Sequence, residues 1–272
     1  SGPPVPSILP FGAPLLSGFF GRLYGEREVG YYNQANKWTG MGHTMLTGMV
    51  WSVTQPLFAR LSYNEPERMQ SVFRKMLRLT AFLSCPALFG LALIAPEFIT
   101  ITITSKWLVS AQLMQLLCIG GAFIPISSFY SNFIISQGKS NIFMWNTIAL
   151  CLAQMLQLVI LYPYGVETMV IAYVVTNTLW LFVWHTFVRY MIGLRLRDAL
   201  RDVLPFVALS AIAMLLAWGA AQPVKDNIYL SLIVKVAVAI LVYIASLRLL
   251  GAKIMNECID FARSKMGLRN KG

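Results

Sequence analysis

One short run of the sequence, Tyr31–Trp38, combines amides, a cation and aromatic rings. Its amides are Asn33, Gln34 and Asn36, and its cation is Lys37. Amide side chains bond sugar hydroxyls, an ammonium pairs with phosphate, and aromatic rings pack against the faces of sugar rings. The run is therefore suited to binding a phosphorylated sugar. The same composition is typical of an aromatic belt at the outer membrane interface, so both interpretations stay open.

Further polar side chains occur inside long apolar stretches. They are Ser127, Ser128, Ser131, Asn132, Gln154, Gln157 and Lys235. The neutral ones either line an aqueous path or bond one helix to another. Lys235 is the basic residue deepest in a stretch, and it either faces a wet cavity or extends its stem toward the outer headgroups. We take Asn132, Gln154 and Lys235 as candidates for lining a cavity.

The acidic residues argue against catalysis. All eleven carboxylates lie in connections, at the edges of apolar stretches or in the C-terminal tail. A proton or sodium relay would be expected to place an acid inside a membrane span, and a membrane enzyme would be expected to pair two of them. No metalloprotease, serine-hydrolase or phosphate-loop motif is present, and the four cysteines are scattered. We therefore expect no enzyme activity, no catalytic residue, no metal site and no cofactor.

Long apolar blocks must position these residues. Hydrophobic residues make up 57% of the 272, charged residues 12%, and the mean hydropathy is +0.63, which excludes an ordinary water-soluble domain. Crossing a bilayer as a helix takes about 20 apolar residues. The first block is too short for this and the other seven are long enough: Ile8–Phe20, Met41–Phe58, Leu79–Ala95, Leu108–Ile135, Ile142–Tyr162, Met169–Val188, Val203–Ala221 and Ile228–Leu247. The expected fold class is an all-α, polytopic transmembrane helix bundle, because backbone groups in lipid must bond within their own segment.

The prolines inside these blocks include Pro86 and Pro125, each within a block long enough to span. Proline lacks an amide N–H, so each should kink its helix and leave one carbonyl without its usual donor. A neighbouring helix or a water molecule must then satisfy that carbonyl.

Lysine and arginine are distributed unequally between the two sides of the blocks. One side holds Arg60, Arg68, Arg74, Lys75, Arg78, Lys139, Arg189, Arg195, Arg197, Arg201 and the basic residues from Arg248 to Lys271. The other side, after the second block, holds Lys106 and Lys225, with Arg22, Arg27 and Lys37 as exceptions before it. Positive residues near span ends are retained in the cytoplasm, so the C-terminus is expected to be cytoplasmic. This topology accounts for the net charge of +11 without nucleic acid as a partner.

Several loose motifs together resemble a known family. They are Val29–Ala35, Pro56–Leu61, Lys75–Arg78 leading to Pro86, and Ser105–Trp107. In order and spacing they resemble the polysaccharide and O-antigen flippases, which carry lipid-linked oligosaccharides and belong to the multidrug/oligosaccharidyl-lipid/polysaccharide exporter superfamily. The resemblance extends over about residues 10 to 200, and the last two blocks match only as hydrophobic helices.

The resemblance implies a two-lobed bundle of twelve to fourteen helices in the bacterial inner membrane. An undecaprenyl-pyrophosphate-linked oligosaccharide would cross between the lobes by alternating access, for the synthesis of a surface polysaccharide such as O-antigen or an exopolysaccharide. This chain would be the C-terminal half: a truncated first helix and connection (1–28), a transmembrane lobe of about six helices (29–192), two additional helices (193–250) and a basic, amphipathic cytoplasmic tail (251–272). The N-terminal lobe would be missing, so the chain is expected to be incomplete alone.

The same resemblance implies which residues bind substrate and which partners the chain has. The implied residues are Asn33, Gln34, Lys37, Arg60 and Lys75, where cations would neutralise pyrophosphate and amides would bind sugars. The expected partners are the lipid bilayer, the lipid-linked oligosaccharide, and a missing N-terminal lobe or polysaccharide assembly proteins. The alternatives are a non-transporting membrane scaffold or assembly partner, a small-molecule exporter of the same superfamily and, least supported, a membrane glycosyltransferase.

Overall fold

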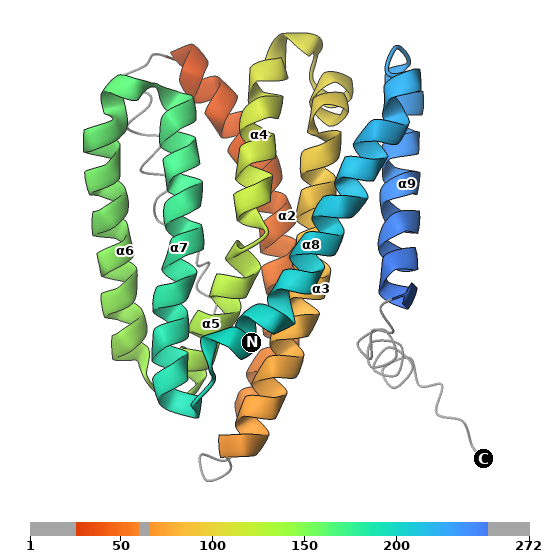
Figure 1. The fold of residues 1–272 in the computed structure, drawn as a ribbon. Coiled ribbons are helices and arrows are strands. Elements are labelled where there is room, and N and C mark those ends of the chain that lie inside the picture. The colour runs from red at the N-terminus through yellow and green to blue at the C-terminus, as the bar shows by residue number, and fades with distance from the viewer. Residues whose placement is uncertain (1–25, 60–65, 250–272) are drawn as a thin grey trace, which may run out of the picture.

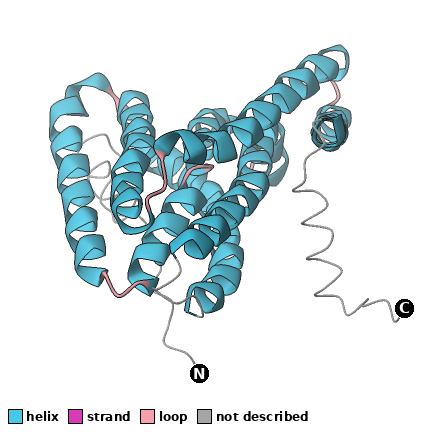
Figure 2. Cartoon of the chain, turned by 60° about the horizontal axis from the view of Figure 1, so that its bottom comes forward, coloured by secondary structure: helices cyan, strands magenta, loops and turns pink. Residues whose placement is uncertain are grey.

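A computed structural model of the chain describes residues 26–59 and 66–249, and the described part is helical with no strand. Short loops join the helices (Figures 1 and 2). The long helices are α2 (Glu26–Ala59), α3 (Pro66–Thr102), α4 (Leu108–Gly121), α5 (Ile124–Ser136), α6 (Ser140–Leu161), α7 (Val166–Ile192), α8 (Leu196–Ala221) and α9 (Ile228–Leu249). Three short 3-10 turns connect some of them: η1 (Ser105–Trp107), η2 (Tyr162–Tyr164) and η3 (Gln222–Val224).

Six helical segments of the described residues are long and apolar enough to cross a membrane. They are Glu67–Thr102, Ser105–Ser136, Ser140–Tyr164, Val166–Ile192, Leu196–Val224 and Ile228–Arg248. The all-α transmembrane fold is therefore confirmed, and six of the seven long apolar blocks lie in these segments. The block Met41–Phe58 lies in α2, whose glycines and hydroxyl side chains make it less apolar than the other six segments. The block Ile8–Phe20 and the tail 251–272 lie outside the described residues.

The block Leu108–Ile135 is two helices rather than one kinked helix. The helix α4 ends at Gly121 and α5 begins at Ile124, with Pro125 in the first turn of α5. A first-turn amide has no helical acceptor, so Pro125 fits there without losing a bond. The kink expected at Pro125 is therefore an interruption between two helices, and the carbonyl four residues before it belongs to Gly121, the last residue of α4.

The prolines inside α3 behave as the sequence predicts. Pro86 leaves the carbonyl of Phe82 without its helical donor, and the hydroxyl of Tyr243 in α9 donates to that oxygen at 3.1 Å. A second proline, Pro96, removes the donor for Ala92, and the side-chain amide of Gln115 in α4 donates to the Ala92 carbonyl at 3.2 Å. Helices on either side of α3 thus satisfy both carbonyls.

An aromatic cluster packs α2, α3 and α5 together. The ring of Phe73 lies 4.7 Å from that of Phe129 and 5.0 Å from that of Phe133, measured between centroids. Phe58 of α2 completes the cluster, 5.0 Å from Phe133. All four rings are almost completely buried. Burying an aromatic side chain contributes roughly 1.5–3 kcal/mol in a soluble core, and in lipid such packing is the main attraction that remains between helices.

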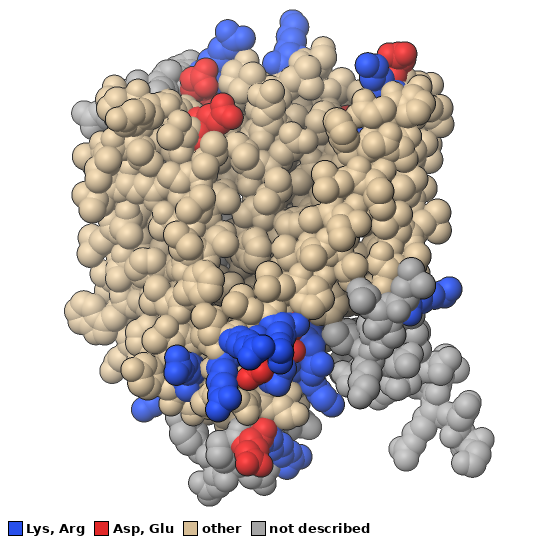
Figure 3. All heavy atoms as spheres, in the orientation of Figure 1, with Lys and Arg blue, Asp and Glu red and all other residues tan. Residues whose placement is uncertain are grey.

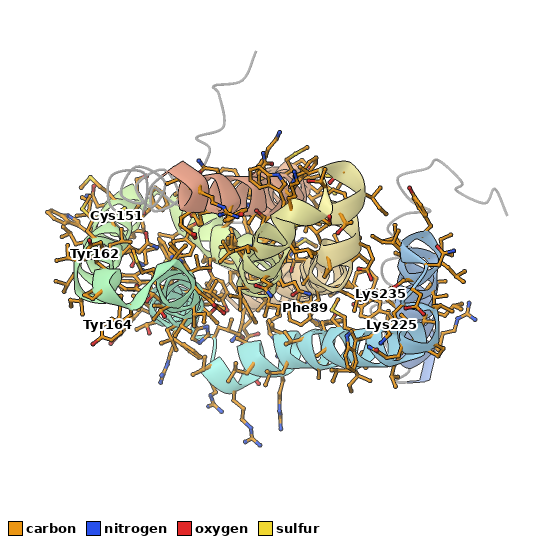
Figure 4. All side chains as sticks on the ribbon, turned by 90° about the horizontal axis from the view of Figure 1, so that it is seen from above. Phe89, Cys151, Tyr162, Tyr164, Lys225 and Lys235 are labelled. Atoms are coloured by element: carbon orange, nitrogen blue, oxygen red, sulfur yellow. The ribbon has the colours of Figure 1, made fainter. Side chains whose placement is uncertain are left out.

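The helix α9 lies at one end of the bundle, and α8 runs from the end of α7 across to it (Figure 4). Seen from above, Lys225 and Lys235 mark this end, whereas Cys151, Tyr162 and Tyr164 mark α6 and its turn to α7 at the other (Figure 4). The helix α8 crosses α3 obliquely and α9 packs on both (Figure 1). Gly193, in the left-handed conformation with φ of 70°, ends α7 and lets the chain turn sharply into α8.

The charged side chains gather at the two ends of the bundle. On the face shown in Figure 3, a broad band without Lys, Arg, Asp or Glu separates a lower edge rich in cations from an upper edge carrying both signs. The lower edge holds the start of α3, the α5–α6 turn, the α7–α8 turn and the end of α9 (Figure 1). The described basic residues there are Arg68, Arg74, Lys75, Arg78, Lys139, Arg189, Arg195, Arg197, Arg201 and Arg248.

Candidate functional site

The first half of α2 divides the run Tyr31–Trp38 into two faces. Tyr31 and Tyr32 are buried, and the ring of Tyr31 packs edge-on against Trp107 at 5.4 Å. Trp38 packs in the same way against Phe98 at 5.0 Å. The aromatic rings therefore hold α2 against the bundle, which is not the arrangement of a belt of rings in the headgroups.

The polar members of the run lie on the opposite face. Asn33 and Lys37 are exposed, and Gln34 is half-buried. The spacing of four residues places Asn33 and Lys37 one turn apart on one face of the helix. The ammonium of Lys37 lies 5.4 Å from the centroid of the Trp38 ring, close enough for a cation–π contact.

A cavity of about 240 Å³ lies beside this face, between α2, α4 and α7. Among the described members of the implied substrate-binding set, Lys37 alone lines it. The full lining is Asn36, Lys37, Thr39, Gly40, His43, Leu117, Gly120, Gly121, Ile124, Tyr173, Val174 and Asn177. We call this the polar pocket, because amides, a cation and an imidazole share it with apolar walls.

Glycines let the helices approach around the polar pocket. A Cβ at Gly120 would overlap the side chain of Val174 in α7, so no larger residue fits there without moving that wall. At Gly121 a Cβ would lie 3.4 Å from the methyl of Thr39 in α2. The pocket therefore owes its shape to two positions in α4 that carry no side chain.

The polar side chains of the pocket differ in their partners. Asn177 donates to the carbonyl of Tyr173 at 2.8 Å and accepts from the amide of Gln154 at 3.4 Å. Thr39 donates to the carbonyl of Ala35. His43 is 7% exposed, and no hydrogen bond joins its ring to another described residue. Its Nε2 lies over Gly40, 3.9 Å from where a Cβ of that glycine would be.

The structure does not bring the implied substrate-binding residues to one place. Asn33, Gln34 and Lys37 lie in the first half of α2, at the upper end of the bundle. Lys75 is exposed near the start of α3, at the lower, cation-rich end. Arg60 lies outside the described residues. Lys37 shares the polar pocket with Gly120 and Gly121, about halfway along the segment Ser105–Ser136, so the two described lysines lie at different depths of the bundle.

The three cavity-lining candidates have different surroundings. Asn132 is buried and donates to the hydroxyl of Thr54 at 3.0 Å, which joins α5 to α2. Gln154 is buried behind the polar pocket and bonds Asn177. Lys235 lines a second cavity of about 470 Å³ between α3, α8 and α9, whose other lining side chains are mostly apolar.

Lys235 has an acidic partner that the sequence pattern did not indicate. Its ammonium lies 2.5 Å from a carboxylate oxygen of Glu97, which also accepts a bond from Ser231 at 2.9 Å. Both charged residues are less than 10% exposed. The apolar block Leu79–Ala95 ends two residues before Glu97, whereas α3 continues to Thr102, so Glu97 is a helical residue that faces α9. The stem of Lys235 therefore points to α3 rather than to the headgroups.

A second ionic contact was also missed. Arg74 of α3 bonds both carboxylate oxygens of Asp202 in α8, at 2.7 and 3.1 Å, and Arg78 approaches the same carboxylate at 3.7 Å. This contact ties α8 to α3 at the cation-rich end. No sequence signal pairs residues so far apart, whereas His43 could have been found, because an ionisable residue inside an apolar block is a functional candidate by default.

The described part of the chain contains no group of three or more His, Cys, Asp and Glu residues arranged to hold a metal ion. Its free cysteines, Cys85, Cys118 and Cys151, are separate from one another. The arrangement around the polar pocket therefore offers hydrogen bonds, one exposed cation and apolar surface, which are means of binding.

Comparisons find that this chain is similar to proteins named for polysaccharide synthesis. A family model described as "Polysaccharide biosynthesis protein" matches residues 15–112. The "Uncharacterized membrane protein in cps region" of Klebsiella pneumoniae is 26% identical over 126 residues, which are 46% of this chain and 25% of that protein. Teichuronic acid biosynthesis protein TuaB of Bacillus subtilis (strain 168) is 22% identical over 202 residues, 74% of this chain and 42% of that protein.

Lipopolysaccharide biosynthesis protein WzxC of Escherichia coli (strain K12) is 24% identical over 121 residues, 44% of this chain and 24% of that protein. The chain thus spans less than half the length of these curated relatives.

A solved structure shares the fold. The lipid II flippase MurJ, in its inward closed conformation, superposes with a TM-score of 0.69 over 91% of this chain and 52% of that one, at 15% sequence identity. The predicted resemblance to polysaccharide flippases of the multidrug/oligosaccharidyl-lipid/polysaccharide exporter superfamily is confirmed.

Proposed function

We propose that this chain is the C-terminal half of a flippase that moves a lipid-linked oligosaccharide, on an undecaprenyl-pyrophosphate carrier, across the bacterial inner membrane. The observation that carries the proposal is the superposition of almost the whole chain on about half of a lipid flippase. The family match and the names of the relatives add polysaccharide synthesis as the context.

We assign the helices to a lobe and two added helices. In this proposal residues 29–192, with α2 to α7, form the C-terminal lobe, and residues 193–250, with α8 and α9, pack on it through α3. A path between two lobes needs both of them, so transport requires an N-terminal lobe joined to this chain or supplied by another.

The chemistry of the substrate matches two different surfaces. The exposed face of α2 offers Asn33, Gln34 and Lys37 to sugars and to pyrophosphate. The second cavity, between α3, α8 and α9, is mostly apolar and suits part of a long hydrocarbon chain. A glycolipid needs both kinds of surface.

The two lysines lie at different depths, which fits alternating access. With the cation-rich edge in the cytoplasm, together with the C-terminus, Lys75 meets the pyrophosphate at the inner opening and Lys37 meets it deeper in the bundle, beside the polar pocket. A lysine at each of these two positions lowers the free energy of a different state of the transport cycle. Arg60 belongs to the same proposed set as Lys75.

The test replaces Lys37 and Lys75 separately by alanine in the complete flippase, in cells that lack their own copy. Each change should reduce surface polysaccharide about tenfold, because a hydrogen bond to a charged group contributes about 1.5–3 kcal/mol. The matched controls are Lys225→Ala at the upper end and Lys139→Ala at the lower end, both exposed. Export and protein abundance are measured together.

Two results would contradict the proposal. Undiminished export with both lysines replaced, at normal protein abundance, would remove the substrate-binding assignment. Normal export in cells from which the complete protein has been deleted would leave a non-transporting scaffold as the better function.

A further inference from the structure

We propose that the polar pocket between α2, α4 and α7 binds one sugar ring of the transported glycan, with the imidazole of His43 as its buried hydrogen-bonding contact. This rests on the proposed function, because the substrate class comes from there. The inference adds a place for a single ring, a residue that contacts it and a means of testing both without transport.

His43 is the first observation that points to a ligand. Buried polar groups in proteins are nearly always hydrogen-bonded, because leaving one without a partner is unfavourable. The ring of His43 is more than nine-tenths buried, lines the pocket, and has no hydrogen-bonding partner among the described residues. A ligand hydroxyl can both donate to and accept from a neutral imidazole, so it supplies the missing partner whichever nitrogen carries the proton.

Asn177 is the second observation. Its amide uses one N–H for the Tyr173 carbonyl, and its oxygen accepts one bond from Gln154. One N–H and one lone pair therefore remain for a ligand. The hydrogen bond from Gln154 fixes the orientation of the Asn177 amide before any ligand arrives. Less side-chain entropy is therefore lost when the ligand binds.

The size and walls of the pocket select a ring. A volume of about 240 Å³ is room for about eight waters, at roughly 30 Å³ each, so one ring fits and a chain of several does not. The walls contributed by Leu117, Ile124 and Val174 are aliphatic, and Tyr173 adds aromatic surface. A sugar ring presents C–H groups to such surfaces and hydroxyls around its edge.

The charges around the pocket disfavour other ligands. No Asp or Glu is among the lining residues, so a metal ion or an organic cation has no counter-charge there. The one lining cation, Lys37, is exposed, which places it at the mouth of the pocket. A free inorganic anion would lie at that mouth and leave His43 without a partner. A sugar carrying a phosphate satisfies both residues at once.

The experiment uses the fact that the chain contains only two histidines, His43 and His185. The full chain is labelled with ¹⁵N-histidine and placed in phosphatidylcholine nanodiscs, because glycoside detergents would compete for the pocket. N-acetylglucosamine 1-phosphate is then titrated to about 10 mM, beyond the roughly millimolar dissociation constant of a weak specific contact. His185 serves as an internal control, since it contacts Tyr130 at 3.2 Å and does not line the pocket.

The expected result is a saturable shift of the His43 signal with the His185 signal unchanged. Asn177→Leu should weaken binding of the probe about tenfold, by removing one polar contact. Thr178→Val is the matched control on the same helix, because Thr178 bonds the Val174 carbonyl and does not line the pocket. An unchanged His185 signal shows that each variant is folded.

Three outcomes would overturn the inference: no shift of His43, equal shifts of both histidines, or the same His43 shift with inorganic phosphate alone. The outcome is separable from that of the proposed function. If the complete protein exports glycan but the probe does not bind, the sugar-binding pocket is rejected and the flippase function stands. If the probe binds saturably but no glycan is exported, the flippase function is rejected and the pocket stands.

Discussion

The hydroxyl of Tyr243 in α9 donates a hydrogen bond, 3.1 Å long, to the carbonyl of Phe82 in α3. This is the carbonyl that Pro86 leaves without a helical donor. The bond therefore completes the backbone of one helix with the side chain of another. In a bilayer no water is at hand to take its place.

Tyr243→Phe should lower the free energy of unfolding by about 1–2 kcal/mol, because it leaves the Phe82 carbonyl unpaired. Thermal unfolding in nanodiscs measures the effect. Tyr229→Phe, an exposed tyrosine in the first turn of α9, is the matched control and should change little. Equal effects of the two substitutions would show that the Tyr243 bond contributes nothing specific.

A second change makes this prediction sharper. Pro86→Ala restores an amide N–H that can donate to the Phe82 carbonyl within α3. In the Pro86→Ala variant, Tyr243→Phe should then lower the free energy of unfolding by less than half as much as it does in the unaltered chain. Additive effects in this double-mutant cycle would mean that the two residues do not act on the same carbonyl.

Lys235→Met should destabilise the chain strongly, by about 3–5 kcal/mol, since it leaves Glu97 buried and unpaired. Replacing both partners, as Lys235→Met with Glu97→Gln, removes the buried charges together and should recover much of the loss. Lys225→Met in the exposed turn before α9 is the control. The abundance of folded protein in the membrane provides the measurement, and a double variant no better than Lys235→Met would argue against the pair.

Gly120→Ala should destabilise the chain by about 1–3 kcal/mol, because the new methyl overlaps Val174. Val174→Ala in the same chain makes room for it, so the double variant should regain stability. Gly219→Ala is the comparison, since a Cβ there meets no atom within 4 Å. If Gly120→Ala lowers the unfolding temperature no more than Gly219→Ala does, α4 and α7 do not approach as closely as described.

Asp202→Ala should loosen α8 from α3 at the cation-rich end. Arg74 and Arg78 remain partly solvated when the carboxylate is lost. The free energy of unfolding should therefore fall by about 1–2 kcal/mol, which is less than the fall expected for Lys235→Met. Hydrogen exchange in the first turns of α8 should rise, whereas Asp226→Ala, in an exposed turn, should leave it unchanged. Unaltered exchange in Asp202→Ala would show that other contacts hold α8.

Much of the fold could be predicted from the sequence because the solvent for these helices is hydrocarbon. The length of the apolar blocks predicts six of the spans, and the distribution of Lys and Arg predicts which connections share an end. The orphaned carbonyl at Pro86 follows from the chemistry of proline. The block Met41–Phe58 is the weakest of the seven, because its glycines and hydroxyls make α2 less apolar than the other long helices.

The site was less predictable, because it depends on which helices become neighbours. Lys37 stood out as a cation among amides, but nothing local says that it borders a cavity with Asn177 of α7. Glu97 and Lys235 are 138 residues apart. The apolar run that predicts a helix ends at Ala95, although α3 continues past Glu97 to Thr102. Pairings of this kind come from packing, which periodicity along one helix does not encode.

The interruption between α4 and α5 falls halfway along the segment Ser105–Ser136. Ends of helices carry partial charges on their unsatisfied carbonyls and amides, and in most membrane helices those ends lie at the water interface. Here they are carried to mid-depth, where Gly120, Gly121 and Ile124 line the polar pocket. The main chain can thus offer a polar group deep in the bilayer, the carbonyl of Gly121, which has no amide N–H at Pro125 to accept from.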